Sequence, residues 1–485
     1  MNVDLTPFLP ELILAGGILA LIVLDLFLKR NRGIVTAIGG VLLLLIVVVV
    51  TLNARQNVGV YLFGAVVQDG MTVLFRVLFA AATILSIAML TFSFPKESEP
   101  YILMLSSVLG MMLLAGANDI VSLFVALELV SIPSYVLAGY HRKDPKSAEA
   151  ALKYVLFGAL SSGLMIYGFS LLYGVSGTTN IPKMADMLAS QGSFGMVTTA
   201  GLILVLAGIG YKVALVPMHF WCPDVYEGSP TPITAFFSVT PKAAGFAALF
   251  RLMPVFAAGM PVTGGLMTAV TLFTVVSAVT MTFGNLGAIW QKSLKRLLAY
   301  SSIAHAGYIL MGFAAIAAFP AGETRDLAAM AVIFYLVTYL FMNLGAFFVV
   351  DYIERREGSD QIAVIKGWGK THPLPALLLA VFLFSLTGLP PLAGFVGKFY
   401  LLAAVVKGKL FALAIIAVLN TVISLYYYIR IIKEMFLNDP DEATIPLSKP
   451  TPRLAIALGV ATLIPTLLLG VAFNGIAVWI SSLVK

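Results

Sequence analysis

The stretch SLTGLPPLAGFVGKFY, residues 385–400, interrupts an apolar run that covers residues 374–406. Such a run is long enough to cross a membrane, for which a helix needs about 20 apolar residues. Proline and clustered glycine break the hydrogen bonding of a helix. The stretch contains Gly388, Pro390, Pro391, Gly394 and Gly397, directly before Lys398. It therefore predicts a discontinuous membrane helix, whose free backbone groups must be satisfied by protein or water.

A second interrupted run lies in the first half of the chain. LAGIGYKVALVPMHFW, residues 206–221, places Gly208, Gly210 and Pro217 around Lys212. Matching broken helices in two halves are typical of transporters built from inverted repeats. The two stretches favour that architecture, although the halves share too little sequence to establish a repeat directly.

The rest of the chain is a succession of apolar runs. Of the 485 residues, 60% are hydrophobic and 11% are charged. About 14 membrane spans are predicted, by the hydropathy rule, at residues 7–28, 34–54, 70–92, 101–116, 119–140, 149–174, 199–220, 231–254, 262–289, 296–318, 327–350, 374–406, 410–437 and 452–482. This predicts an all-α polytopic membrane protein with two discontinuous helices and no separate soluble domain.

Composition excludes several other classes. The single cysteine, Cys222, excludes a disulfide framework and a multi-cysteine metal or iron–sulfur site. The net charge of +7 comes with no basic stripe that has interleaved aromatics, so nucleic-acid binding is not expected. Residues 7–28 have no basic segment ahead of them and indicate a first membrane span rather than a cleavable signal.

Basic residues are unevenly divided between the two sets of loops. The richer set contains KRNR (29–32), HRKDPK (141–146), QKSLKR (291–296), ERREG (354–358), Lys366, Lys370, Arg430, Lys433, Lys449 and Arg453. The poorer set contains Arg55, Lys183, Arg325, Lys407 and Lys409. Because basic loops stay in the cytoplasm, both chain ends are expected on the outer, periplasmic side of the inner membrane. The acidic segment 222–230 is read as a short cytoplasmic loop.

Four charged residues lie inside apolar runs: Glu128, Lys212, Lys242 and Lys398. A charge at the centre of a bilayer helix costs roughly 2.5–3.5 kcal/mol, so such residues point to function. A buried lysine loses its proton more readily than an exposed one, whereas an arginine keeps it. We expect the four residues to form one polar line at mid-membrane depth. A structural ion pair, or a lysine that reaches the membrane surface, is the alternative for each.

A weaker set of candidates comprises Lys153, His219, Lys295 and His305. The two lysines lie near loops that are expected to be cytoplasmic, and a membrane histidine serves equally well in packing or proton relay. The sequence shows no phosphate-binding loop, nicotinamide or flavin fingerprint, haem-attachment motif or nucleophile–base arrangement. No catalytic, cofactor-binding or metal-binding residue is therefore expected on this chain, and an energy source must come from partners.

Three segments resemble the antiporter-like membrane subunits of respiratory complex I. They are LVPMHFWCPDVYEGSPTPITAFFSVTPKAAGF (215–246), KRLLAYSSIAHAGY (295–308) and SLTGLPPLAGFVGKFYLL (385–402). The resemblance extends over nearly the whole chain. It implies 14 helices with two inverted five-helix repeats in a single membrane domain. The implied parts are three N-terminal helices (1–100), a first repeat (101–255), a second repeat (262–437) and a C-terminal helix (452–482).

The resemblance also implies functional roles. It places the family's essential glutamate at Glu128 and its membrane lysines at Lys212, Lys242 and Lys398, with further matches at Lys153, His219, Lys295 and His305. The implied function is proton translocation within an NADH:quinone oxidoreductase, a translocase in whose other subunits FMN, iron–sulfur clusters and quinone are expected. Neighbouring membrane-arm and peripheral-arm subunits and lipids are the expected partners.

Three alternatives remain open at this stage. The first is a subunit of a multi-subunit sodium/proton antiporter. The second is a subunit of a related complex driven by ferredoxin, formate, hydrogen or a reduced deazaflavin. The third is a structural spacer, against which the four membrane charges argue. The absence of a carboxylate-rich sodium site favours protons over sodium.

Overall fold

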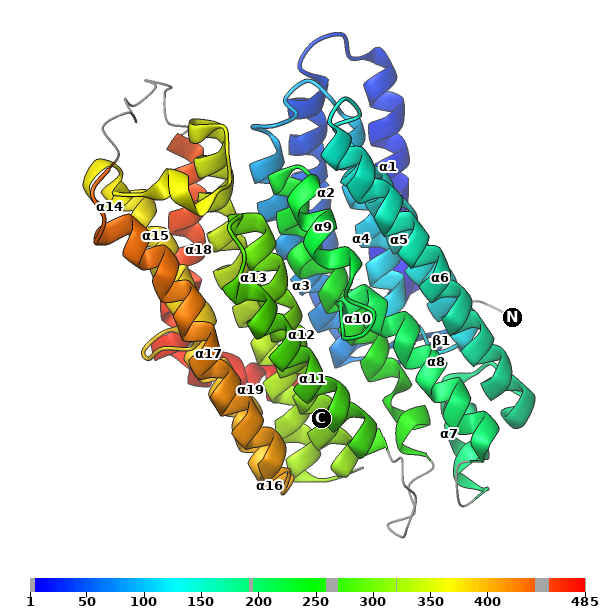
Figure 1. Ribbon diagram of the computed structural model, residues 1–485. Coiled ribbons are helices and arrows are strands. Elements are labelled where there is room, and N and C mark those ends of the chain that lie inside the picture. Colours follow the sequence, from blue (N-terminus) through cyan, green and yellow to red (C-terminus); the bar gives the residue numbers. More distant parts are fainter. Residues whose placement is uncertain (1–4, 192–194, 259–268, 320, 441–452, 485) are drawn as a thin grey trace. The chain divides into compact units, whose positions relative to one another are not determined.

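The computed structural model describes residues 5–191, 195–258, 269–319, 321–440 and 453–484, which are almost entirely helical (Figure 1). The helices in these ranges are α1 (Leu9–Phe27), α2 (Arg32–Asn53), α3 (Gly70–Leu90), α4 (Glu99–Ala115), α5 (Ile120–Ala138), α6 (Pro145–Ser176), α7 (Ile181–Ala189), α8 (Met196–Val213), α9 (Trp221–Gly228), α10 (Thr231–Ala257), α11 (Ala269–Ile289), α12 (Leu294–Ala318), α13 (Glu323–Glu357), α14 (Trp368–Thr371), α15 (Pro373–Thr387), α16 (Ala393–Lys407), α17 (Phe411–Phe436), α18 (Arg453–Val471) and α19 (Phe473–Val484). Two short strands, β1 (Gly59–Tyr61) and β2 (Val66–Gln68), pair antiparallel between α2 and α3. Short 3-10 helices cover Thr6–Phe8, Ala54–Gln56, Leu62–Gly64 and Ile362–Ile365.

The predicted spans correspond to helices throughout the described residues. Eleven helices in these ranges are long and apolar enough to cross a membrane, and α18 with α19 forms one further, bent pair. The helices α4 and α15 are shorter but apolar. Each predicted run coincides with one helix or a consecutive pair, although residues 262–268 of one run and residue 452 of another lie outside the described part. The prediction of an all-helical polytopic membrane protein is confirmed.

Two local predictions are wrong. The run 452–482 does not form one continuous helix, because Ile456–Val471 and Phe473–Leu483 differ in direction by 85°. Both arms are apolar, so hydropathy does not reveal the bend between them. The segment 222–230 is not a plain loop, because most of it forms the short helix α9.

The chain divides into two compact units. Unit 1 comprises residues 1–221 and 240–272, and unit 2 comprises residues 222–239 and 273–483. Within unit 1, α6 packs against α8, α4 against α5, and α2 against both α1 and α3. Within unit 2, α13 is the central helix and contacts α12, α15, α16 and α18. Helix α8 and the break after it lie in unit 1, and the second break lies in unit 2 with α15 and α16 on either side.

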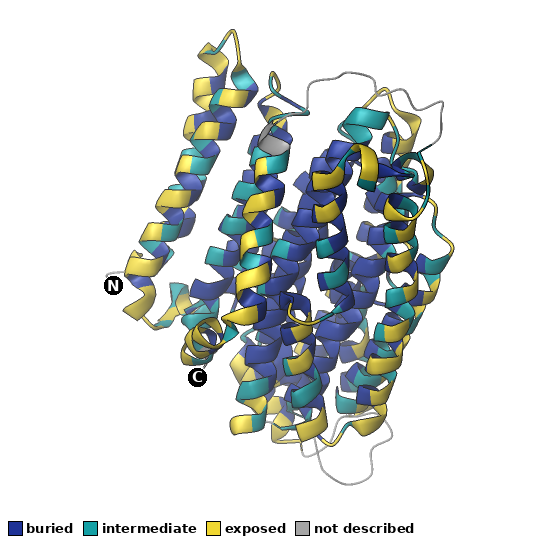
Figure 2. Ribbon diagram, turned by 90° about the vertical axis from the view of Figure 1, so that its left-hand side faces the viewer, coloured by how far each residue is buried: buried dark blue, intermediate teal, exposed yellow. Residues whose placement is uncertain are grey.

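Burial differs strongly between helices (Figure 2). In α10 and α12, 100% and 94% of the most apolar 18-residue segment is buried, against 33% in α1, α2 and α6. The outer faces of these last three helices carry large apolar side chains, such as Leu19, Leu42 and Leu160, that are more than half exposed. Exposed apolar faces of this extent are suited to a hydrocarbon environment.

Two arginines fix the β-hairpin and the helix ends around it in unit 1. Arg76 on α3 forms a buried ion pair with Glu11 on α1, at 2.7 Å, and donates to the side chain of Gln68. Arg251 on α10 binds Asp69 with both terminal nitrogens, at 2.6 and 2.8 Å. Burial acts to raise the pKa of Asp69, but the Arg251 guanidinium and the Thr72 donors outweigh it and hold the pKa below its usual value. Both arginines thus act as anchors at span ends.

Arg76→Met should destabilise the chain by about 3–5 kcal/mol, because it leaves Glu11, whose side chain is 2% exposed, without its buried counter-charge. The double variant Arg76→Met/Glu11→Leu should recover most of the loss, since an apolar pair of similar volume is often no less stable than a buried ion pair. Thermal unfolding in mild detergent measures both. A single variant as stable as the parent chain would contradict this prediction.

Candidate ion-translocation site

The first break follows Lys212, in the last turn of α8. The helix ends at Val213 because Ala214 adopts left-handed backbone angles, φ 61° and ψ 48°. The backbone N–H of Leu215 then donates to the carbonyl of Gly210 at 2.7 Å, which closes the helix end. Residues 214–220, including Pro217, lie outside the regular helices, and Trp221 begins α9. Lys212 is 1% exposed, so its side chain is buried.

Lys212 faces a polar strip on α5. Its ammonium donates to the hydroxyl of Ser131 at 3.1 Å. Glu128 lies three residues earlier on α5, where its carboxylate accepts a hydrogen bond from Ser162 on α6. Residues three apart occupy the same face of a helix, and Glu128 is the negative charge that acts on Lys212. The structure thus brings these two predicted residues together.

Lys242 belongs to the same unit and is 3% exposed on α10. Gly245, on the next turn of α10, packs directly on the end of α8. A Cβ atom at Gly245 would lie 2.5 Å from a methyl of Val213 and 3.5 Å from Cβ of Lys212. The close approach of the two helices places Lys242 about one turn from the Lys212 backbone, so three of the four predicted residues cluster in unit 1.

The second break separates α15 from α16 in unit 2. Gly388 ends α15 with a φ of 93°, which few residues other than glycine adopt, and α16 begins at Ala393. Lys398 on α16 reaches back across the break and donates to the carbonyl of Thr387 at 2.8 Å. That carbonyl belongs to the last turn of α15 and has no partner within its own helix. The lysine, 5% exposed, therefore satisfies a helix end with its charge.

A group of aromatic and polar side chains surrounds Lys398 in unit 2. Its ammonium lies 4.4 Å from the ring centre of Tyr308 on α12. The ring of His305 lies 6.0 Å from that of Tyr308, and its Nδ1 shares a 2.7 Å hydrogen bond with the hydroxyl of Tyr335 on α13. One turn away, the Tyr339 hydroxyl donates to Ser302 at 2.8 Å. These contacts line the facing sides of α12 and α13 with hydroxyls and an imidazole.

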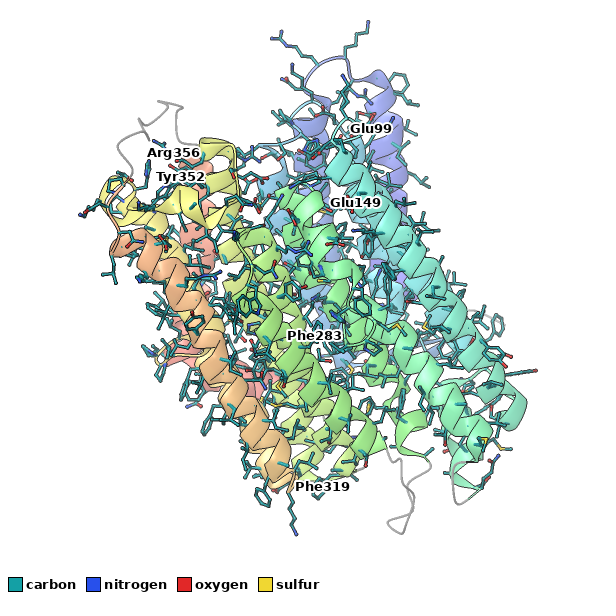
Figure 3. All side chains as sticks on the ribbon, viewed as in Figure 1. Glu99, Glu149, Phe283, Phe319, Tyr352 and Arg356 are labelled. Atoms are coloured by element: carbon teal, nitrogen blue, oxygen red, sulfur yellow. The ribbon has the colours of Figure 1, made fainter. Side chains whose placement is uncertain are left out.

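The other weaker candidates are found in different surroundings. Lys153 forms a 2.6 Å pair with Glu149 (Figure 3) on α6, and its side chain is 34% exposed, as expected of a lysine near the membrane surface. His219 is buried in the first break, with its ring 4.5 Å from that of Phe220. Lys295 is buried at the start of α12 and contacts Glu354.

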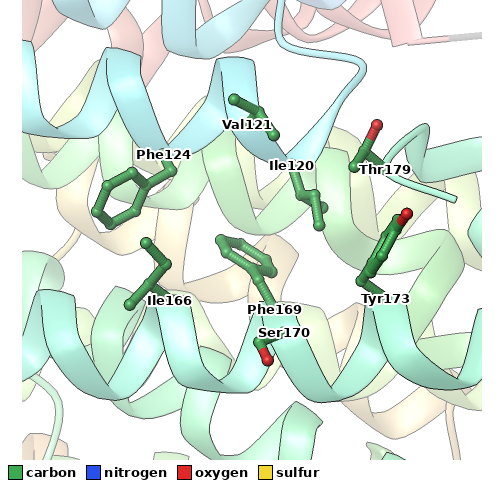
Figure 4. Close-up of a pocket in the computed structure, with 8 residues that line it drawn as sticks. All are labelled: Ile120, Val121, Phe124, Ile166, Phe169, Ser170, Tyr173 and Thr179. Atoms are coloured by element: carbon green, nitrogen blue, oxygen red, sulfur yellow. The ribbon is translucent and has the colours of Figure 1, made fainter.

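An apolar groove of about 300 Å³ lies between α5 and α6 in unit 1 (Figure 4). Its lining residues are Ile120, Val121, Phe124, Ile166, Phe169, Ser170, Tyr173 and Thr179. Hydrocarbon side chains make up most of this lining, and its hydroxyl groups come from Ser170, Tyr173 and Thr179. Glu128 is not among the lining residues, so the groove is not assigned to the proposed site.

Sequence reasoning missed the polar residues of α13. Tyr335, Tyr339 and Asn343 recur every fourth residue and therefore share one face. Asn343 donates to Ser238 at 2.6 Å. A second group, Asn285 on α11 with Asn420 and Tyr427 on α17, is also buried and hydrogen-bonded. The spacing of the α13 residues was a usable signal, although hydropathy alone conceals it.

Buried lysines beside two helix breaks in a polytopic membrane protein define an antiporter-like membrane subunit. Residues 117–424 match the family model described as NADH:quinone oxidoreductase/Mrp antiporter, transmembrane. The chain is 42% identical over 466 residues to NADH-quinone oxidoreductase subunit N of Chlorobium chlorochromatii (strain CaD3), covering 93% of this chain and 89% of that protein. The chain therefore belongs to the NADH:quinone oxidoreductase/Mrp antiporter family. The family resemblance of its three sequence segments is thus confirmed.

Solved structures of multi-subunit complexes share the fold. A chain of respiratory complex I from Thermus thermophilus matches with a TM-score of 0.78 and 32% identity, covering 96% of this chain and 98% of that one. A chain of the Mrp complex from Dietzia sp. DQ12-45-1b matches with a TM-score of 0.82 at 22% identity, covering 99% and 97%. The second likeness concerns the fold alone, so it does not make this chain an antiporter subunit.

Proposed function

We propose that the chain is a proton-translocating membrane-arm subunit of an NADH:quinone oxidoreductase. The observation that carries the proposal is the burial of Lys212 at a helix break, with Glu128 as the charge that acts on it. The similarity to subunit N of such enzymes supports the identity of the whole assembly. Electron transfer through FMN, iron–sulfur clusters and quinone belongs to partner subunits, and this chain contributes proton movement.

The proton path runs through the residues that the two breaks position. Lys212 exchanges protons with the cytoplasmic side, and Glu128 adjusts its proton affinity as a movable counter-charge. A change of one pKa unit corresponds to about 1.4 kcal/mol, so modest movements of the carboxylate suffice. Lys242 passes protons on toward Lys398, which exchanges them with the outer side. His219, His305, Lys153 and Lys295 are secondary relay candidates.

The loop charges support an orientation in the inner membrane. The basic loops are cytoplasmic and both chain ends lie on the periplasmic side, since positively charged loops resist translocation. Labelling of single cysteines, introduced near each chain end in a Cys222→Ser background, by a membrane-impermeant reagent tests this arrangement in intact cells. Labelling near both ends before lysis supports it.

Glu128→Gln should lower NADH-driven proton pumping several-fold, because an amide cannot act as a counter-charge to Lys212. The measurement uses the purified assembly in liposomes, with proton uptake and NADH oxidation recorded together. Glu323→Gln, on the exposed start of α13, is the matched control and should pump normally. Wild-type pumping by a fully assembled Glu128→Gln variant would refute the role of Glu128. Sodium-dependent proton exchange without any electron donor would instead support the antiporter alternative.

A further inference from the structure

An ion pair joins a buried lysine to a partly exposed carboxylate where α12 begins and α13 ends in unit 2. The Lys295 ammonium lies 3.1 Å from the Glu354 carboxylate and 3.3 Å from the carbonyl of Ser229. The Lys295 side chain is 6% exposed, whereas that of Glu354 is 34% exposed. The Thr231 hydroxyl, from the start of α10, also donates to Glu354. The carboxylate thus touches both solvent and the buried ammonium.

Beyond Lys295 the polar groups continue inward. The Ser302–Tyr339 and His305–Tyr335 hydrogen bonds follow in order along α12, and Tyr308 then contacts Lys398. Lys295, Ser302 and His305 are seven and three residues apart, so they share one face of the helix. One side of α12 therefore carries titratable or hydroxyl groups from its first turn to the Lys398 site.

Two residues with an unsatisfied buried polar atom lie near the two ends of the stretch between Lys295 and the Ser302–Tyr339 pair. Among the described residues, the Ser229 hydroxyl oxygen and the Asn343 amide oxygen have no hydrogen-bond partner. Ser229 is the residue whose carbonyl accepts from Lys295, and Asn343 is one turn from Tyr339. A buried polar group without a partner is costly unless water satisfies it. Both atoms point to bound water that bridges this stretch.

We propose that Glu354 is a second proton acceptor at the surface, which acts in the same pumping cycle as the uptake at Lys212 and feeds Lys295 and, through the α12–α13 polar face, Lys398. This inference rests on the proposed function. The Glu354 carboxylate takes a proton from a hydronium ion or a buffer acid and becomes neutral. It then transfers that proton to the neutral amine of Lys295, which restores the carboxylate and forms the ammonium. Lys295 releases the proton inward to water and returns to the amine.

The other carboxylates near Glu354 have hydrogen-bond or ion-pair partners of their own. On α13 itself, Asp351 accepts from Arg355 at 2.7 Å. Asp360 accepts from the hydroxyl of Ser293. From α9, Asp224 and Glu227 both contact Arg296, at 2.6 and 3.0 Å. Among the carboxylates of this cluster, Glu354 is the one that contacts Lys295 through its side-chain nitrogen.

Glu354→Gln should slow pumping in a pH-dependent way. Without the carboxylate, Lys295 must take protons directly from hydronium ions in water. The hydronium concentration falls tenfold for each unit by which the pH rises. The variant should match the parent near pH 6 and fall toward about a tenfold loss per pH unit above the point where uptake limits the rate. Formate, a small weak acid, should restore pumping, and Glu354→Asp should behave like the parent. Glu357→Gln, one turn further along α13, is the matched control.

The outcomes separate the possible failures. An equal loss at every pH, without rescue by formate, assigns Glu354 a structural role and overturns the inference, as does unchanged pumping across the range. Subunit content of the purified assembly shows whether the variant has simply failed to assemble. Glu354→Ser, which removes the carboxylate and leaves room for formate, then carries the pH test. If Lys212→Met and Lys398→Met also pump normally, the proposed function itself fails. If those two variants are inactive, only the role of Glu354 is in question.

Discussion

Lys398→Met should lower NADH-driven proton pumping by at least about tenfold, and Lys212→Met should do the same. Both side chains are buried, at 5% and 1% exposure, where methionine fills a similar volume but binds no proton. Since pumping is coupled to electron transfer, NADH oxidation should slow as well. Proton uptake by liposomes that contain the assembly, recorded with NADH absorbance, measures both effects.

Arginine substitutions separate proton exchange from the need for a positive charge. Arginine retains its proton at any pH relevant to the protein, so it can replace a structural cation but not a proton carrier. Lys212→Arg and Lys398→Arg should therefore be as inactive in pumping as the methionine variants. Substantial activity in the arginine variants would show that the lysines only supply charge at the two breaks.

Matched controls come from exposed lysines. Lys407→Met changes the same helix as Lys398, and Lys183→Met changes the short helix α7 of unit 1. Both lysines are exposed and should tolerate the change with pumping near the parent level. If the controls lose as much activity as the buried variants, the effect reflects a general loss of positive charge. The specific roles of Lys212 and Lys398 would then be refuted.

The two helix breaks were predictable from sequence, but the role of each glycine was not. Gly388 does end α15, with its positive φ. Gly208, expected to weaken α8, instead lies within the helix where a Cβ atom would come 2.4 Å from Cβ of Met165. Ala214 ends α8 in a left-handed conformation that alanine rarely adopts. Composition indicates where a helix can break, whereas packing decides which residue adopts the non-helical backbone conformation.

The candidate site was predictable in its charges and not in its hydrogen-bond partners. A charge in an apolar run is conspicuous because its burial is costly, which is why Lys212 and Lys398 could be selected directly. Tyrosine and serine do not stand out in an apolar run in this way. The contact of Tyr335 with His305 could not be predicted, because it depends on how α12 and α13 pack. Glu354 lies in a basic loop segment by sequence, and only the fold brings it to Lys295.

Gly394→Ala should disrupt the second break more than any change of charge. A Cβ atom at Gly394 would lie 1.8 Å from the carbonyl oxygen of Ser385 and 2.8 Å from its carbonyl carbon. Both are backbone atoms of α15, so no side chain can rotate away and α16 must shift. Overpacking of a core costs typically 1–3 kcal/mol and occasionally more, and we expect a cost of about 3 kcal/mol here. Lys398 lies one turn further on α16, so the shift also removes its hydrogen bond to Thr387.

For Gly394→Ala we expect a severalfold lower amount of the chain in the membrane, and weak pumping by the fraction that assembles. Immunoblots of membranes and pumping per assembled complex measure the two effects separately. Gly174→Ala on α6 is the control, because nothing lies within 4 Å of its Cβ position and alanine favours a helix by about 1 kcal/mol over glycine. Normal abundance with normal pumping in Gly394→Ala would mean that α15 and α16 separate easily at the break. The hydrogen bond from Lys398 to Thr387 would then not depend on their close contact.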